Sequence, residues 1–179
     1  TMVDRIVPAA TKELIDRASS ISGYYDTAVV AHEPFRQWVI EDDFVDSARP
    51  DFEAVGAELV HDVAPFEHMK LRMLNGTHSA LAYLGIVAGY EVVAEAIRDE
   101  EIERFIDDLW RKEITESLVS PPITNLNEYA RQLKSRYRNL EIRHLLEQIA
   151  MDGSQKLPQR ILAPLFENLS AGKPYKRFL

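Results

Sequence analysis

The sequence predicts a mainly α-helical domain with a minor β element near its N-terminus. From residue 66 onward, apolar residues recur at three- and four-residue spacing, which is the period of an α-helix. The stretch 80–88 is apolar almost all round, as expected of a buried central helix. The β-rich segments are short and lie before residue 41. The 179 residues are 46% hydrophobic and 28% charged, which is ordinary for a globular protein that buries a core.

The first part of the chain predicts short elements. Residues 2–8 resemble the end of a strand, and a strand with no obvious partner suggests a fragment of a larger protein. Thr11 is expected to cap a short helix over residues 11–20, because its side chain can accept a hydrogen bond from the first turn. Two short strands are expected at 27–31 and 35–40.

The remainder predicts helices separated by turn signals. Asp51 follows a proline and is expected to cap a helix that extends to Val60. Pro65 opens the next segment, and the central helical region follows from Phe66. Further helices are predicted at 90–97, 99–110, 127–137, 142–149 and 156–169.

Composition excludes several classes of site. The absence of cysteine excludes disulfides, thiolate zinc sites and iron–sulfur clusters. The net charge of −8, with no dense Lys/Arg block, argues against nucleic acid as a partner. No signal peptide begins the sequence, because Met2 is soon followed by Asp4 and Arg5. The longest apolar stretch is too short to span a bilayer, so we expect a cytoplasmic protein without a membrane partner.

The most informative polar residues lead into the apolar central helix. On an ideal α-helix Asn75 lies about 140° and His78 about 80° from Lys70, so the three share a broad face. A lysine shielded from water can lose its proton near neutral pH and then accept a hydroxyl proton. An asparagine amide can donate a hydrogen bond to the reacting oxygen, and a histidine can hold a neighbouring hydroxyl. The trio is therefore a candidate acid–base site.

Taken singly, each residue of the trio has a more ordinary interpretation. A lone lysine is usually solvated, an asparagine before glycine usually marks a helix end, and a histidine beside an apolar helix is usually a core residue. A non-catalytic helical interaction domain therefore remains an alternative, and it predicts that the three side chains point into solvent in different directions. The residues His61, Glu67 and His68 lack the H-E-x-x-H spacing, so no metal site is expected.

Four short blocks occur in a recognisable order. Residues 3–8 read V-D-R-I-V-P, and the trio reads K-x(4)-N-x(2)-H; residues 33–42 and 152–160 form two more blocks. Together they resemble the mannitol dehydrogenase family, the polyol-specific long-chain dehydrogenases, over almost the whole chain. Within that family they are most similar to the members that interconvert fructuronate and mannonate.

The resemblance implies an NAD-dependent, metal-independent oxidoreductase built from two domains. It implies that residues 1–179 form the helical C-terminal substrate domain, and that an N-terminal Rossmann domain, absent from this chain, binds most of the NAD. The chain indeed has no G-x-G-x-x-G turn. A fragment lacking that domain is expected to be inactive. The active site is expected in the cleft between the two domains.

The resemblance also implies roles for individual residues. Lys70 is the general base in alcohol oxidation and the acid in ketone reduction, Asn75 polarises the reacting oxygen, and His78 orients substrate hydroxyls. Asp4 matches an acidic residue near cofactor and substrate, and Lys156 matches a lysine near the substrate.

The substrate is expected to be a sugar acid or a polyol. A sugar acid needs a cation for its carboxylate, for which Arg36, Lys156 and Arg160 are candidates. Mannitol-specific members are expected to carry a basic residue where this chain has Gln148, which favours the fructuronate/mannonate type. Mannitol 2-dehydrogenase, or another polyol dehydrogenase, remains the alternative. For Arg36 and Arg160 a structural ion pair or a solvated position remains open as well.

Overall fold

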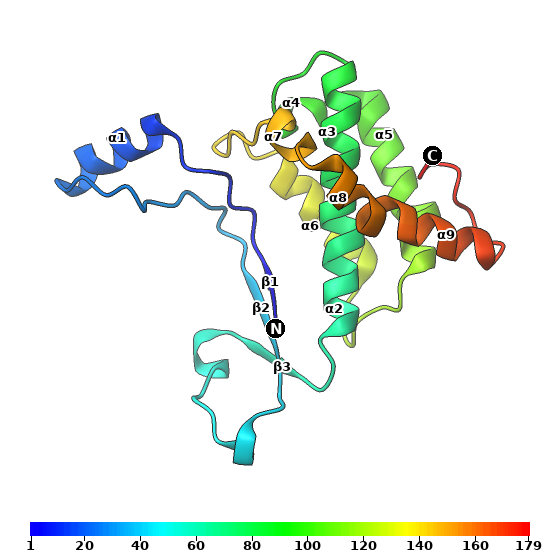
Figure 1. Cartoon of the computed structure of the whole chain (residues 1–179), viewed down its shortest axis with the longest axis horizontal. Helices are drawn as coiled ribbons and strands as arrows, with labels where there is room; N and C mark the ends of the chain where they lie inside the picture. The colour runs from blue at the N-terminus through cyan, green and yellow to red at the C-terminus, as the bar shows by residue number, and fades with distance from the viewer.

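The chain consists of a helical body and an N-terminal arm, as the computed structural model of residues 1–179 shows (Figure 1). Helices α2 to α9 form the body. Helix α1 and a three-stranded sheet form the arm, and the sheet lies beside the start of the central helix (Figure 1). The prediction of a mainly α-helical fold with a minor β element near the N-terminus is confirmed.

The sheet joins three short strands in the order β1-β2-β3, which are Met2–Asp4, Gln37–Glu41 and Glu58–Val60. Strand β1 pairs antiparallel with β2, with Met2 opposite Val39, and β2 pairs parallel with β3. Met2 and Val39 pack with Phe66 of the first body helix into a small apolar cluster of their own. The predicted strand at residue 2 therefore does have partners within the chain.

Helix α1, Lys12–Ser22, begins and ends as its sequence predicts. The Thr11 side chain accepts a hydrogen bond from the Leu14 N–H (3.2 Å), and Gly23 ends the helix with a positive φ of 76°. The helix has no buried residue and projects from the body (Figure 1). Within this chain its apolar side chains therefore contribute little to folding.

Two predictions in the arm are wrong. Residues 27–31 form a turn and extended chain instead of a strand. The helix expected after Asp51 is only one 3-10 turn, Glu53–Val55, in which the Asp51 side chain accepts a hydrogen bond from the Ala54 N–H. Gly56, with a φ of 85°, reverses the chain, and the residues that follow pair with β2 as strand β3. Backbone pairing with β2 therefore outweighs the weak helix-capping signal of Asp51.

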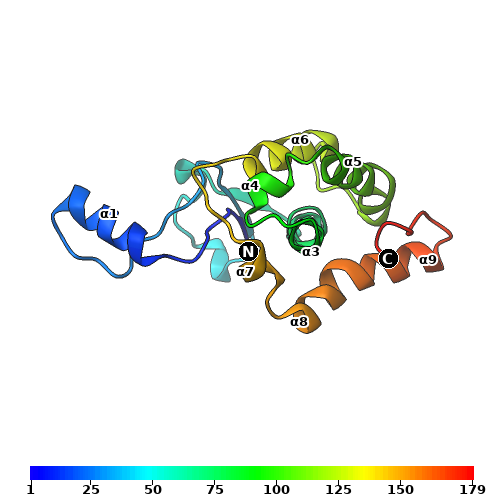
Figure 2. The ribbon, with the colours of Figure 1, turned by 90° about the horizontal axis from the view of Figure 1, so that it is seen from above.

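Three long helical rods dominate the body. The central rod runs through α2 (Ala64–Met69), η3 (Lys70–Gly76) and α3 (Thr77–Val87), and Figure 2 shows it nearly end-on, flanked by the others. The second rod runs through α5 (Glu100–Leu109), η4 (Trp110–Ile114) and η5 (Thr115–Ser117). The third runs through α8 (Gly153–Leu157), η6 (Pro158–Leu162) and α9 (Ala163–Ser170). The segments η3, η4 and η6 are π-helical, with i→i+5 hydrogen bonds that commonly mark functional positions.

The remaining helices are shorter: α4 (Val93–Ala96), α6 (Leu126–Tyr137) and α7 (Leu146–Ala150). The sequence predicts longer helices at 90–97 and 142–149, and both of those lengths are wrong. Gly89, at a φ of 87°, ends the central rod, and Val92 then forms a β-bridge with Leu145. The bridge engages the backbone groups that a longer helix would need. None of the helices combines the length and apolar composition needed to cross a membrane.

The core lies between the three rods and comprises 21 buried residues. Its polar members are hydrogen-bonded across rods: the Trp110 Nε1–H donates to Met73 O (3.2 Å) and to Thr77 Oγ1 (2.8 Å). The Tyr137 hydroxyl donates to Leu74 O (3.0 Å). These bonds from η4 and α6 satisfy carbonyl and hydroxyl groups around the π-helical part of the central rod and stiffen it.

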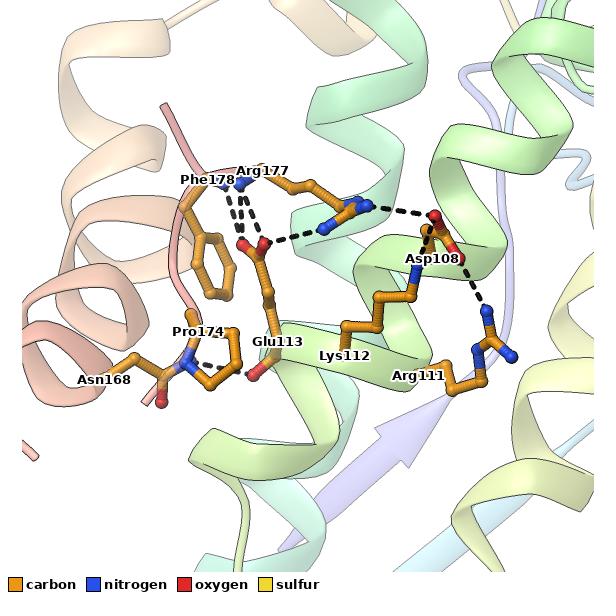
Figure 3. Close-up of polar contacts among 8 residues, drawn as sticks. All are labelled: Asp108, Arg111, Lys112, Glu113, Asn168, Pro174, Arg177 and Phe178. Carbon is orange, nitrogen blue, oxygen red and sulfur yellow. Dashed lines mark hydrogen bonds and ion pairs between the residues drawn. The ribbon is translucent and has the colours of Figure 1, made fainter. Parts of the chain in front are cut away.

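The C-terminal tail folds back onto the body through one buried carboxylate (Figure 3). Glu113, 1% exposed, accepts hydrogen bonds from the backbone N–H groups of Arg177 and Phe178 and from the Arg177 guanidinium. Asn168 donates to Glu113 O (2.9 Å) and to Pro174 O (2.7 Å). The C-terminal tail is thus anchored to the body.

Candidate active site

The π turn η3 carries the lysine and the asparagine of the predicted trio, and the histidine follows in α3. In a π turn the backbone bonds join residues five apart, so Lys70 and Asn75 come closer to one face than α-helical geometry allows. The angular separation predicted from an ideal α-helix is therefore wrong for this pair. The π turn improves the alignment that the acid–base interpretation requires.

Lys70 points its amine at the first strand. Its Nζ donates a hydrogen bond to Val3 O (2.5 Å), and the side chain is only partly buried. No carboxylate of the chain forms an ion pair with this amine. A lysine held by a neutral carbonyl keeps two further N–H positions for another partner.

The strand that holds Lys70 is itself fixed by a buried ionic cluster. Asp4 is fully buried and pairs with Arg136 of α6 through both carboxylate oxygens (2.6 and 3.1 Å). Arg136 also pairs with buried Glu33 (2.7 and 2.9 Å), and the Tyr129 hydroxyl donates to Asp4 (2.5 Å). Although burial opposes it, these two carboxylates raise the pKa of Arg136.

The geometry of Asp4 differs from that of an exposed ligand-binding carboxylate. Its oxygens already accept from Arg136 and Tyr129, and none of its surface is accessible. Asp4 joins the arm to α6 through Arg136. It directly follows Val3, whose carbonyl accepts the hydrogen bond from Lys70. Its predicted contact with cofactor and substrate stays a prediction.

His78 is the most enclosed member of the trio, with 6% of its surface exposed. Burial lowers its pKa well below the usual range, and the charges of His144, Arg136 and Arg160 act in the same direction. The ring packs against Tyr137 (4.8 Å between centroids) and His144 (5.1 Å). Its Nε2 is buried without a hydrogen-bond partner. The imidazole is therefore neutral near pH 7 and has unused hydrogen-bonding capacity.

Arg160 of η6 lies against the same stretch of the central rod. Its Nη1 donates to Ser79 Oγ (3.2 Å), while its buried Nε has no partner. A Cβ at Gly76 would stand 3.0 Å from Arg160 O, so glycine allows the two π segments to approach closely. Burial lowers the pKa of Arg160, and no carboxylate of the chain pairs with it. This is a half-buried cation without a counterion.

Asn75 in η3 and Lys156 in α8, just before η6, occupy half-buried positions. No side-chain hydrogen bond within the chain engages the Asn75 amide, and its backbone carbonyl accepts from Ser79 Oγ (3.3 Å). Lys156 lies one helical turn before Arg160 and makes a long contact with Ile149 O (3.4 Å). Gln148 is half-buried in the neighbouring α7. The Asn75 amide and the Lys156 amine are thus available to a ligand.

Arg36 is not part of this group. It is exposed on the loop before β2 and lines a separate hollow of about 350 Å³ with Phe35, Met69 and Tyr129. Of the five most clearly defined hollows, none is lined by Lys70 or Asn75. His78 lines a small one of about 10 Å³. Within the chain, the Lys70 amine is partly exposed beside strand β1, whereas the His78 ring is buried.

Sequence reasoning missed the residues that support the trio. Arg136, Tyr137 and His144 contact the ionic cluster or the histidine ring, and each lies 59 to 132 positions along the chain from its partner. Each has an ordinary sequence context in a helix or a loop. Only the tertiary fold brings them to the site.

The fold is a helical body in which Lys70 and Asn75 lie on the π-helical turn of the central rod, His78 follows in the next helix, and Arg160 packs against the same stretch. Residues 62–179 match the mannitol dehydrogenase C-terminal domain, and residues 1–54 match the mannitol dehydrogenase Rossmann domain. The chain belongs to the mannitol dehydrogenase family. The two matches divide the chain between residues 54 and 62, where the sequence predicts a single C-terminal domain over residues 1–179.

Individual relatives support the same family. D-mannonate oxidoreductase of Escherichia coli K12 is 51% identical over 98% of this chain and 36% of its own length. Mannitol 2-dehydrogenase of Aspergillus terreus is 38% identical over 98% of this chain and 36% of its own length. The structure of Pseudomonas fluorescens mannitol 2-dehydrogenase, a ternary complex with NAD and D-mannitol, superposes with a TM-score of 0.89 at 35% identity, covering 99% of this chain and 36% of that one. The chain spans about a third of the length of the curated relatives it matches.

Proposed function

We propose that this chain supplies the acid–base and substrate-binding side of an NAD-dependent oxidoreductase that interconverts a keto-sugar acid and its alcohol, of the fructuronate/mannonate type. The observation that carries the proposal is the π turn, which carries an amine and an amide without carboxylate partners and leads directly into the helix of a buried neutral imidazole. Proteins commonly place π turns at functional sites. The similarity to D-mannonate oxidoreductase supports the choice of reaction.

Each residue of the trio has one task in this mechanism. The Lys70 amine accepts the proton of the substrate hydroxyl in oxidation and returns it in reduction, while its bond to Val3 O holds it in place. The Asn75 amide donates a hydrogen bond to the same oxygen, where negative charge develops. The His78 ring, neutral because of its lowered pKa, exchanges a hydrogen bond with a neighbouring hydroxyl. NAD, when bound, accepts the hydride.

The residues present fit the proton-transfer half of this reaction and not the binding of a dinucleotide pyrophosphate. The chain has no G-x-G-x-x-G turn after a strand. We place NAD binding mainly on the part of the dinucleotide-binding domain that the relatives carry beyond this match. The arm, residues 1–54, would then be the end of that domain, and its exposed Ile21, Tyr24 and Tyr25 would pack against the rest of it. The full enzyme would close the active site between the two parts, without a metal ion and in the cytoplasm.

Arg160 is the cation that we assign to the carboxylate of a sugar acid. It is half-buried, lacks a counterion and keeps a buried unpaired Nε close to Ser79. Lys156, one turn earlier, adds a second positive charge on the same helix. Exposed Arg36 lies in a different hollow and is the weaker candidate.

A test of the acid–base role compares Lys70→Met with wild type in the full-length enzyme. Methionine keeps the aliphatic stem but removes the proton acceptor, so we expect kcat to fall by about 10²–10⁴ with an unchanged melting temperature. Lys176→Met, at an exposed position of the tail, serves as the control and should keep full turnover. Near-normal turnover of the Lys70 variant would defeat the assignment.

The polyol alternative has its own support in the structural similarity to a mannitol 2-dehydrogenase. Comparing fructuronate with fructose as substrates separates the polyol alternative from the main proposal. Arg160→Met should raise the KM for fructuronate by about 10- to 100-fold, the value of one charge-assisted hydrogen bond, while fructose, which has no carboxylate, is affected little. Arg36→Met is the matched control. Faster turnover of fructose than of fructuronate by the unmodified enzyme would favour the polyol reaction instead.

A further inference from the structure

Two histidine rings meet edge-to-face across the small cavity beside the central rod. The rings of His78 and His144 lie 5.1 Å apart at 81°, and both line the hollow of about 10 Å³. The Nε2 of His78 and the Nδ1 of His144 are buried, and neither has a hydrogen-bond partner in the chain. The wall also includes the polar side chains of Arg136 and Asn139.

Two unpaired buried nitrogens in one cavity, which is lined by apolar and polar side chains in equal number, call for a shared partner. A buried polar group left unpaired costs on the order of 1–3 kcal/mol, and a single water can satisfy several such groups. The hollow has about the volume that one water needs. Burial lowers the pKa of both histidines, so each ring is neutral and offers one N–H and one lone pair. Water, which both donates and accepts, can bridge this pair.

The backbone that carries the His144 ring is held at two points. The backbone N–H of His144 donates to Ile142 O (3.0 Å), and its backbone carbonyl accepts from the Val93 N–H (3.1 Å), next to the β-bridge between Val92 and Leu145. A ring carried by a backbone fixed in this way can impose an orientation on a neighbour. The Tyr137 ring confines His78 from another side, 4.8 Å away.

We propose that a water in this cavity bridges Nε2 of His78 and Nδ1 of His144, and that His144 is thereby a positioning residue for His78. In this bridge the water accepts from the Nε2–H of His78 and donates to Nδ1 of His144, so the His78 proton stays on Nε2 and its Nδ1 is left to accept from a substrate hydroxyl. Only this last consequence rests on the proposed function. The bridge itself is a property of the chain.

The test replaces His144 by residues that differ in where they place a polar atom. Asparagine has a polar atom near the position of Nδ1, whereas glutamine and phenylalanine have none there. We expect the ¹⁵N chemical shifts of the His78 ring to report one tautomer in the chain and in His144→Asn, and a mixture of tautomers in His144→Phe and His144→Gln. His61→Phe, at an exposed position, is the control. An unchanged His78 spectrum in folded His144→Phe or His144→Gln overturns the proposal.

Kinetics of the full-length enzyme then separate this proposal from the assigned reaction. His144→Phe should raise the KM for the sugar about 5- to 20-fold with a smaller change in kcat, and His144→Asn should restore it. A tautomer change without any turnover of sugar acids or polyols supports the bridge and defeats the reaction. An unchanged tautomer, with turnover lost in Lys70→Met, overturns the bridge and supports the reaction.

Discussion

Unpaired polar groups gather at a few residues of this chain. Only four buried side-chain atoms lack a hydrogen-bond partner, and three of them belong to His78, His144 and Arg160 around the central rod. Buried polar atoms are usually satisfied, so such exceptions need an explanation, and a bound ligand or an ordered water supplies one. Elsewhere, buried charges such as Asp4, Glu33 and Glu113 are fully paired. The cost of unpaired groups is concentrated where we place the substrate.

The buried histidine makes stability depend on pH. The pKa of His78 is lowered in the folded state, so below about pH 6.5 the unfolded chain binds a proton that the folded chain does not. The free energy of unfolding should therefore decrease as the pH falls from 7 to 5, by on the order of 1 kcal/mol per pH unit below 6.5. Urea unfolding at several pH values measures it.

The variant His78→Phe removes this titration and should show a shallower loss of stability between pH 7 and 5, although its stability at pH 7 differs. His61→Phe should follow the wild-type curve, because that side chain is exposed. Parallel curves for wild type and His78→Phe would show that the ring is protonated equally in the folded and unfolded chain.

At the residue scale, the sequence predicts the trio but not its surroundings. Lys70, Asn75 and His78 were found because they lie within nine positions of each other and match a family motif. The partner of Lys70 is a backbone carbonyl 67 positions away, and Arg136 reaches Asp4 across 132 positions. Neither contact produces a recognisable pattern in the sequence around its residues. Residues far apart in sequence meet only after the rods have packed.

At the scale of elements, the π turns matter most and are the least predictable. A period of 3.6 residues fits the apolar positions of the central rod, so the sequence gives no sign that Lys70–Gly76 widens into i→i+5 bonding. Local signals do predict the caps of α1 and the sheet strand over 37–41. They fail at β3 and at the shortened α4 and α7, because strand pairing and a β-bridge take the backbone bonds that a helix would use.

The glycine at the contact of two π segments offers a test of this packing. Helix propensity alone predicts that Gly76→Ala stabilises the chain by about 1 kcal/mol. The new Cβ would stand only 3.0 Å from the carbonyl oxygen of Arg160, a backbone atom in a helix that moves little. We therefore expect Gly76→Ala to destabilise the chain by about 1–2 kcal/mol in urea unfolding. A gain in stability would mean that η3 and η6 lie farther apart.

At the scale of the whole molecule, one arginine joins the arm to the body. Arg136 extends from α6, its side chain 6% exposed, and pairs with Asp4 at the start of the arm and with Glu33 just before β2. It also lies 4.0 Å above the ring of Phe35. Because Val3 O holds the Lys70 amine, the same cluster that docks the arm also positions the proposed proton acceptor. Docking of the arm and geometry of the site are therefore coupled.

Removing this arginine should release the arm and leave the body folded. In Arg136→Met the carboxylates of Asp4 and Glu33 remain buried without a counterion, which should cost about 3–5 kcal/mol and expel β1 from its place beside α6. Hydrogen exchange should then speed up in β1 and β2, while the core helices α3 and α5 keep their protection. Arg131→Met on the same helix is the matched control, because Arg131 forms only an exposed pair with Glu128, worth little. Equal protection of β1 in both variants would show that the small apolar cluster of Met2, Val39 and Phe66 suffices to dock the arm, and that the ionic cluster does not position Lys70.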